Sequence, residues 1–280
     1  MRVIGIDFTS APSRSKHITQ LVCEFNDGML STVVYERWQD FRHFEDFLRQ
    51  PGPWIAGLDF PFGQSRRFIE NAHWPLDWAA YTQHVAAMSK EEFYDELNGY
   101  KIGRAKGDKE HRRVTDRRAS SISPQKLYGV PTAKMFYQGV RRIRSANVTI
   151  PHLKQGDPQR IVVEAYPGVL ARQLIGRRSY KNDDESKQTR ALETARRDII
   201  DRLKHDAVAE SHNLTLKVYE SLVDEIIEDA SGDLLDALLC AIQAAWSWTL
   251  RDEGFGAPSD VDTLEGWIAD PLVASKDEIT

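Results

Sequence analysis

Short apolar runs separated by turn signals dominate the N-terminal part of the chain and predict strands. Residues 2–8 and 54–59 are each a nearly continuous apolar run, which is typical of a strand buried on both faces. Residues 17–25 and 29–37 flank an Asp-Gly pair, a strong signal for a hairpin turn. Residues 39–50 have apolar positions at helical spacing and stop before a proline. The predicted order is therefore strand, hairpin, helix, strand.

The C-terminal half returns to one strand and then becomes helical. Residues 160–165 are a strand-like apolar run, and residues 186–205 and 215–229 have the spacing of amphipathic helices. Residues 232–250 are apolar nearly all round, which predicts a buried helix. Three antiparallel strands followed by parallel strands that alternate with helices indicate an α/β fold with a mixed sheet.

The middle of the chain has a different pattern. Residues 66–151 are aromatic, basic and mainly helical or irregular, with short helices predicted at 91–97 and 132–144. We interpret this segment as a long insertion into an α/β core. The predicted core consists of residues 1–65 and 152–280.

The bulk composition indicates an ordinary water-soluble protein. Hydrophobic residues make up 41% of the 280 residues, and no apolar run approaches the length of about 20 residues that a membrane span needs. The N-terminus has a strand pattern and lacks the features of a secretory signal peptide. Cys23 and Cys240 lie in apolar segments, which favours buried free thiols in a reducing compartment. We therefore expect a cytoplasmic protein with no membrane partner.

The net charge of −5 conceals a strong asymmetry. Residues 99–144 carry thirteen Lys and Arg against three Asp and Glu, a local charge of +10, so the remainder of the chain carries −15. A basic region on an acidic body can attract a polyanion without a basic overall pI. The alternative is a solvated, charged loop. If a nucleic acid binds here, the expected contacts are Arg112, Arg113, Arg117, Arg118 and Lys126.

Carboxylates end three of the predicted strands, and two more lie in the apolar helix. They are Asp7, Asp59, Glu164, Asp233 and Asp236. A carboxylate on an apolar segment costs free energy unless it is neutralised, paired or bound to a metal. Strand ends and the start of a packed helix can bring such groups to one place. Hard cations such as Mg²⁺ prefer oxygen ligands, and two of them about 3.5–4 Å apart can act on a phosphodiester. We therefore expect an acid cluster around divalent cations.

Each of the five acids also has a structural alternative. Asp7 and Asp59 precede possible turns, Glu164 could pair with an arginine, and Asp233 could complement the dipole of its helix. Asp236 is the hardest to explain in this way, because its neighbours are apolar and it lies beyond the usual cap position.

Four short motifs carry a resemblance to a known superfamily. They are Gly5-Ile6-Asp7, Leu58-Asp59-Phe60-Pro61, Val163-Glu164-Ala165-Tyr166-Pro167 and Asp233-Leu234-Leu235-Asp236-Ala237. With these motifs the chain resembles the ribonuclease-H-like superfamily, and more closely a domain family of unknown function described as predicted ribonuclease-H-like nucleases. The resemblance implies a mixed five-stranded sheet of order 3-2-1-4-5, flanked by helices.

The resemblance also implies a function, namely metal-dependent hydrolysis of phosphodiesters by a nuclease that uses Mg²⁺ or Mn²⁺. It assigns catalytic roles to Asp7, Asp59, Glu164 and Asp236, and metal binding to these four and Asp233. The histidine or lysine that the superfamily has near its helix-borne acid has no evident counterpart. The candidates for that role are Lys187, His205 and His212.

Two other functions compete with a nuclease. An actin-like ATPase or a sugar kinase would share the opening topology, but it needs a glycine in its first phosphate hairpin where this chain has Thr9. A non-catalytic nucleic-acid-binding module would use the basic segment for phosphates and its aromatic residues for stacking. The aromatic candidates are Tyr100, Tyr128, Phe136 and Tyr137. The sequence leaves open whether the substrate is DNA, RNA or a small phosphorylated molecule.

Overall fold

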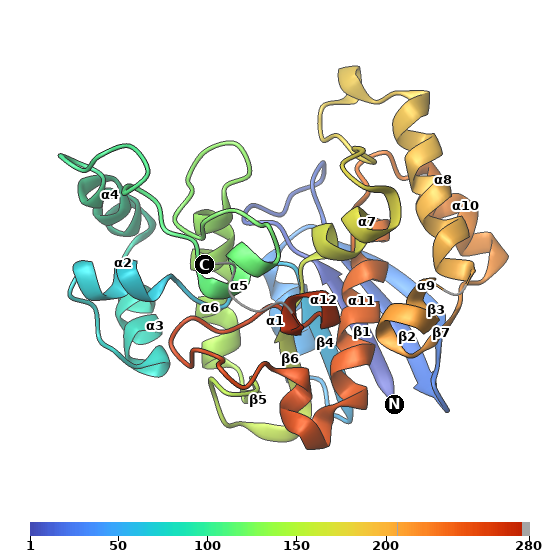
Figure 1. The fold of residues 1–280 in the computed structure, drawn as a ribbon, viewed down its shortest axis with the longest axis horizontal. Coiled ribbons are helices and arrows are strands. Elements are labelled where there is room, and N and C mark those ends of the chain that lie inside the picture. The colour runs from blue at the N-terminus through green and yellow to red at the C-terminus, as the bar shows by residue number, and fades with distance from the viewer. Residues whose placement is uncertain (206, 276–280) are drawn as a thin grey trace.

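Seven strands form one mixed sheet with helices on both faces in the computed structural model, which describes residues 1–205 and 207–275 (Figure 1). The sheet order is β5-β6-β4-β1-β2-β3-β7. The pairs β1–β2 and β2–β3 are antiparallel, and all other neighbours are parallel. The strands are β1 (Arg2–Asp7), β2 (Ile18–Asn26), β3 (Met29–Trp38), β4 (Trp54–Leu58), β5 (Val148–Thr149), β6 (Asp157–Glu164) and β7 (Thr215–Lys217).

The α/β class and the mixed sheet are as predicted, but the strand number and order differ from the predicted five-stranded 3-2-1-4-5 arrangement. The five longer strands lie in the order β3-β2-β1-β4-β6, and β5 and β7 extend the sheet at its two edges. Strands of two and three residues are too short to produce an alternating pattern. The prediction of a helix over 215–229 was therefore wrong at its start, and the helix here is α10 (Glu220–Glu228).

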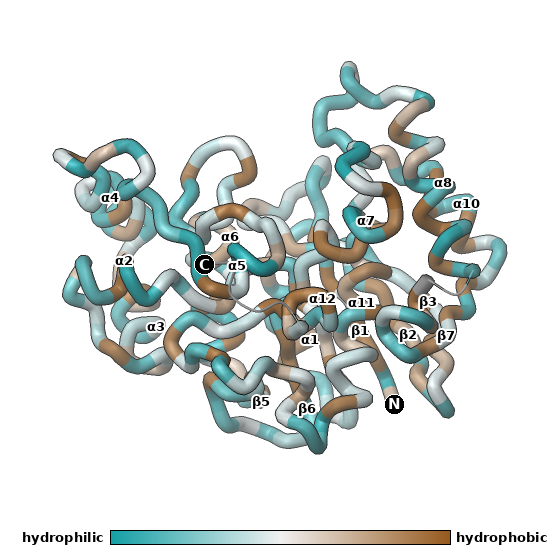
Figure 2. Tube along the Cα trace, in the orientation of Figure 1, coloured by the Kyte–Doolittle hydropathy of each residue, from teal (hydrophilic) through white to brown (hydrophobic). Residues whose placement is uncertain are grey.

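One face of the sheet packs against the C-terminal helices. These are α7 (Pro167–Ile175), α8 (Arg190–Lys204), α9 (Ala207–His212), α10 and α11 (Asp233–Thr249). Strand residues alternate between the two faces, so Val3 and Ile55 join this apolar layer while Ile4 and Ala56 point to the other one. The helix α11 is apolar over most of its length and lies across the middle of the sheet, as predicted for residues 232–250 (Figures 1 and 2).

The other face packs against α1 (Phe41–Arg49) and the middle segment of the chain. That segment contributes α2 (Arg66–Asn71), α3 (Trp78–Ala87), α4 (Lys90–Tyr100), α5 (Val114–Arg118) and α6 (Thr132–Ser145). Its aromatic residues form one apolar cluster with the sheet, and β5 pairs with β6. Residues 66–151 are thus a layer of the fold. The C-terminal part adds α12 (Pro271–Ala274), and no helix in the described ranges is both long and apolar enough to cross a membrane.

Two glycines let α11 approach the sheet more closely than any side chain would permit. A Cβ atom at Gly5 of β1 would lie 1.8 Å from the carbonyl oxygen of Ala237, and one at Gly57 of β4 would lie 2.4 Å from that of Cys240. These contacts hold the N-terminal part of α11 directly against the middle strands. The position of Asp236 relative to the strand ends therefore depends on glycine at positions 5 and 57, because a side chain at either position would overlap the backbone of α11.

The glycine contact predicts a specific loss of stability. Gly5→Ala should lower the free energy of unfolding by at least about 1–3 kcal/mol, because the added methyl group overlaps backbone that cannot move without displacing α11. Urea unfolding followed by circular dichroism measures this change. Gly99→Ala is the matched control, because its Cβ meets nothing within 4 Å and alanine favours the helix α4. Equal stability of the native and Gly5→Ala proteins would contradict the packing described here.

Candidate metal centre

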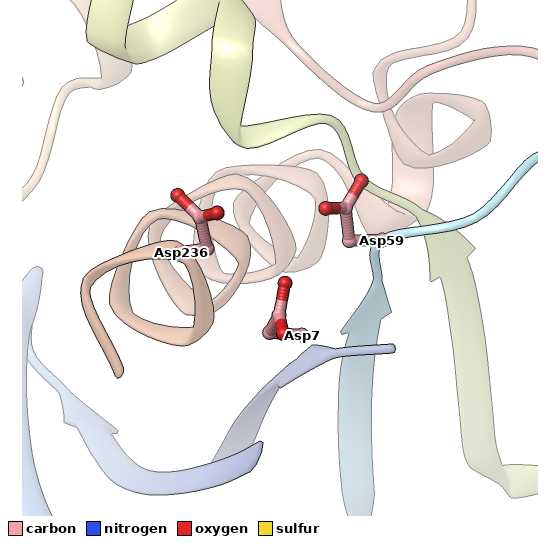
Figure 3. A group of neighbouring side chains, drawn as sticks. All are labelled: Asp7, Asp59 and Asp236. Carbon is pink, nitrogen blue, oxygen red and sulfur yellow. The ribbon is translucent and has the colours of Figure 1, made fainter. Parts of the chain in front are cut away.

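Three carboxyl groups from distant parts of the chain converge at the carboxyl end of the middle strands of the sheet. Asp7 is the last residue of β1, Asp59 follows β4, and Asp236 lies in the first turn of α11. One carboxylate oxygen of each lies within 4.8 Å of the other two, and Figure 3 shows the three groups turned toward a common space. The strands β1 and β4 are parallel neighbours, so their carboxyl ends meet at the same edge. This group can hold a metal ion, as the sequence predicted for these three residues.

The carboxylate of Asp236 has two partners, which lie in the loop between α7 and α8. The hydroxyl of Tyr180 donates a hydrogen bond of 2.6 Å to Oδ1 of Asp236, and the ammonium group of Lys181 forms an ion pair with Oδ2. The side chain of Lys181 lies against Gly232, whose positive φ of 74° turns the chain into α11. Sequence reasoning missed Lys181, because it lies in a polar loop with no periodic pattern.

Asp7 and Asp59 lack such partners and are therefore hard to ionise. Among the described residues, no hydrogen-bond donor reaches either side chain. Burial first, and then the charge of Asp233, holds the pKa of Asp7 well above its usual range. Burial and the charge of Asp236 raise the pKa of Asp59 to about 7. Lys181 lowers both pKa values but does not cancel these effects. The cluster thus has more negative charge than its surroundings neutralise.

Asp233 and Glu164 lie beside the cluster and have different surroundings. Asp233 is the first residue of α11 and is half-buried, and burial raises its pKa to about 6. Glu164, at the end of β6, is buried and accepts bonds of 2.5 and 2.7 Å from Arg113 and one of 2.8 Å from the backbone N–H of Phe62. The arginine partner left open by the sequence is therefore present. Neither acid belongs to the group of three converging oxygens.

The five basic residues predicted to contact nucleic acid are in unequal positions. Arg113 is 1% exposed and binds both Glu164 and Asp116, the latter at 2.8 Å, so its guanidinium is part of the protein interior. Arg112 and Arg117 are exposed. Arg118 pairs with Asp260 at 2.6 Å. The ammonium group of Lys126 lies 5.0 Å from the centre of the Tyr128 ring.

The three residues considered for the superfamily's histidine or lysine lie away from the acids. Lys187 is exposed and pairs with Asp184 at 2.8 Å. The ring of His205 lies 2.6 Å from the carbonyl oxygen of Asp201. His212 is buried, 3.6 Å from Asp270. Lys181 is the basic residue that contacts the helix-borne acid.

A pocket of about 300 Å³ opens beside the cluster. Asp59, Asp236, Glu164 and Lys181 lie in its wall. Residues of the middle segment, of the sheet end and of the start of α7 supply most of the remaining lining. The apolar and aromatic lining residues are Phe60, Pro61, Ile122, Val130, Met135, Ala165, Tyr166, Pro167, Tyr180 and Ile268. The acids therefore face a small, largely apolar enclosure that residues 66–151 help to close.

The chain belongs to the family described as "Protein of unknown function (DUF429)", whose model matches residues 5–262. The match contains all five acids and the whole middle segment. Searches of curated proteins and of solved structures return no significant match.

The buried ion pair predicts a large effect of one arginine on stability. Arg113→Ala should lower the free energy of unfolding by about 3–5 kcal/mol, because Glu164 and Asp116 would remain buried without their cation. Arg112→Ala, one residue away and exposed, should change it by no more than about 0.5 kcal/mol. Chemical denaturation of both variants checks this. Equal effects would show that Arg113 has no structural role beyond that of its exposed neighbour.

The raised pKa of Asp59 predicts a pH dependence in metal-free protein. The folded state holds the Asp59 proton up to about pH 7, whereas the unfolded chain loses it near pH 4. Stability from this group is therefore fully present below pH 4 and is lost as the pH rises to about 7. Asp59→Asn should thus gain stability relative to the native protein between pH 5 and pH 8 in EDTA.

The control for this measurement is Asp95→Asn, which removes an exposed carboxylate. The difference in the free energy of unfolding between Asp95→Asn and the native protein should stay constant over the same pH range. A constant difference for Asp59→Asn as well would mean that the cluster does not strain the folded state.

Proposed function

We propose that this protein is a metal-dependent phosphodiester hydrolase, a nuclease of the ribonuclease-H-like type that holds one or two Mg²⁺ or Mn²⁺ ions. The observation that carries the proposal is the spacing of Asp7, Asp59 and Asp236. Ligand oxygens within 4.8 Å of one another suit a cation that binds oxygen at about 2.0–2.6 Å. The three carboxylates and the ammonium of Lys181 together leave two negative charges, which one divalent cation neutralises.

The chemistry of the donor set fits a hard cation. All three candidate ligands are carboxylates, and a divalent cation bound to them would polarise a phosphate and lower the pKa of a water molecule. Asp7 and Asp59 come from strand ends fixed by backbone pairing, so their positions are preorganised. Asp233, beside the three, is a candidate for a second ion. The Phe62 and Arg113 contacts of Glu164 hold this acid at the pocket wall, where it can orient a bound water.

Lys181 is the candidate for a positively charged partner of the substrate. It lies in the pocket wall and contacts Asp236, so its ammonium group is near the point where a phosphate would meet the cluster. We assign to it the role of the basic residue near the helix-borne acid of the superfamily. The order β3-β2-β1-β4-β6 of the five longer strands also supports a relationship of this chain to the ribonuclease-H-like superfamily.

Two features argue against the competing functions, and a third supports a polyanionic substrate. The turn after β1, where a kinase would need space for phosphate, contains Phe8, whose ring packs 4.6 Å from that of Phe60 and 5.3 Å from that of Phe44. A non-catalytic binding module has no use for acids whose ionisation is opposed by burial. The charge of +10 over residues 99–144 supports a polyanionic substrate.

Metal binding and hydrolysis test the proposal together. Isothermal titration with Mn²⁺ should detect binding to the native protein and at least about tenfold weaker binding to Asp59→Asn, which removes one ligand. Hydrolysis of bis(p-nitrophenyl) phosphate should require Mg²⁺ or Mn²⁺ and fall by at least about a hundredfold in the same variant. Asp95→Asn is the control and should match the native protein in both assays.

The two assays separate the possible failures. Metal binding without hydrolysis would leave the cluster as a structural cation site and remove the nuclease function. Equal Mn²⁺ affinity in the native and Asp59→Asn proteins would contradict the metal centre itself.

A further inference from the structure

We propose that the substrate is the end of a single-stranded nucleic acid, whose terminal nucleotide enters the pocket beside the carboxylates while the next base stacks on Tyr128. This inference rests on the proposed hydrolase function and adds to it the form of the substrate. Four independent features support it: the size of the pocket, the exposure of one tyrosine, the lysines around that tyrosine, and the loop that joins the two places.

The pocket is too small for a duplex. A volume of about 300 Å³ lies at the lower end of the range for small-ligand pockets, and a duplex, whose major groove alone is about 12 Å wide, does not fit into it. Ile122, Val130 and Met135 from the middle segment line the pocket together with Tyr166 and Pro167 at the start of α7. These apolar side chains suit the faces of one base, and the cation proposed to bind at Asp59 would meet its phosphate.

Tyr128 is the exposed aromatic candidate in the basic segment, and its hydroxyl donates a hydrogen bond of 3.3 Å to Glu110. Its side chain is 62% exposed. Phe136 and Tyr137 are buried in the apolar layer, and the ring of Tyr100 packs edge-on against Phe68 at 4.8 Å. An exposed ring beside cations can bind bases without regard to sequence, because every base has a stacking face.

Lysines surround that ring and provide the charge for phosphates. The ammonium groups of Lys101 and Lys126 lie 5.8 and 5.0 Å from the centre of the Tyr128 ring. Lys101, Lys106 and Lys109 line a surface depression together with Tyr128. The one acid there, Glu110, is already paired with Lys101 at 2.7 Å.

Two of these lysines can contact a phosphate without breaking an ion pair. Lys106 and Lys109 are exposed and have no ion-pair partner within the described parts of the chain. The arginines of the same segment are more engaged, since Arg113 is buried between acids and Arg118 is paired with Asp260. Positive charge open to a phosphate backbone is therefore present beside Tyr128, at Lys106 and Lys109.

A single short loop separates the stacking surface from the pocket. Val130 lines the pocket and Tyr128 lines the depression, so their Cα atoms are at most about 7 Å apart. This distance is about twice the 3.4 Å rise of a stacked strand, so the terminal nucleotide must be unstacked from the next one when it enters the pocket. The loop is anchored at its base, where the N–H of Ala133 donates to the carbonyl of Lys126 at 3.0 Å. One strand can therefore occupy both places at once.

The reaction at such an end is a simple hydrolysis. Water adds to the phosphorus of the terminal phosphodiester, and the bond from phosphorus to the oxygen of one nucleoside breaks. The proton from water passes to the leaving oxygen. The products are one mononucleotide and a strand shorter by one residue, and a circular strand offers no starting point.

Binding and cleavage of a matched pair of substrates test this inference. The probes are a fluorescein-labelled 30-nucleotide single strand, the same strand closed into a circle, and the corresponding duplex. With Ca²⁺ in place of Mn²⁺, so that a divalent cation still occupies the carboxylates, fluorescence anisotropy should give at least tenfold weaker competition by the circle and by the duplex than by the linear strand. With Mn²⁺, the linear strand should release mononucleotides and the circle should remain intact.

Substitution of the exposed tyrosine provides the second arm. Tyr128→Ala should weaken binding of the linear strand about tenfold, whereas Tyr128→Phe, which keeps the ring, should stay within about twofold of the native protein.

The outcomes distinguish the two proposals. If bis(p-nitrophenyl) phosphate is not hydrolysed, the hydrolase function fails, and the anisotropy measurements still decide the binding mode. The inference is overturned if circle and linear strand bind or are cut equally. It is also overturned if Tyr128→Ala binds the linear strand as tightly as the native protein does.

Discussion

The close packing of α11 against β1 and β4 determines the rest of the site. Because Gly5 and Gly57 have no side chains, the helix backbone lies directly on the two strands whose carboxyl ends hold Asp7 and Asp59. The first turn of the helix then brings Asp236 to the same point. Burial of three like charges is unfavourable unless a cation joins them. The proposed metal centre follows from this backbone contact, with Lys181 as a partial substitute for the cation.

The middle segment of the chain, residues 66–151, has two structural roles, although its sequence pattern indicates only one basic segment. Its aromatic residues complete the apolar layer on one face of the sheet, and its loops form one wall of the pocket. Several of its positive charges are used inside the protein or at its surface, as in the pairs Arg113–Glu164 and Lys101–Glu110. The local charge of +10 therefore overstates what a ligand meets, and the lysines near Tyr128 are among the charges that remain exposed.

The sequence was sufficient to predict the three converging acids, because a carboxylate at the end of an apolar strand or within an apolar helix is visible without coordinates. It was insufficient for the partners of those acids. Arg113 and Glu164 are 51 positions apart in the sequence, and Lys181 and Asp236 are 55 positions apart. Contacts between residues so far apart leave no local pattern in the sequence. The edge strands β5 and β7 escaped prediction for a different reason. They are too short for periodicity, and their pairing is supplied by neighbours far away in the chain.

The central claim is that Asp7, Asp59 and Asp236 together bind a divalent cation. Anomalous diffraction from crystals soaked in Mn²⁺ tests it most directly, because the manganese signal locates the ion independently of the protein density. The account predicts a peak within bonding distance, about 2.0–2.6 Å, of an oxygen from each of the three carboxylates. The absence of a peak there at millimolar Mn²⁺, with the ammonium group of Lys181 still paired to Asp236, would contradict it.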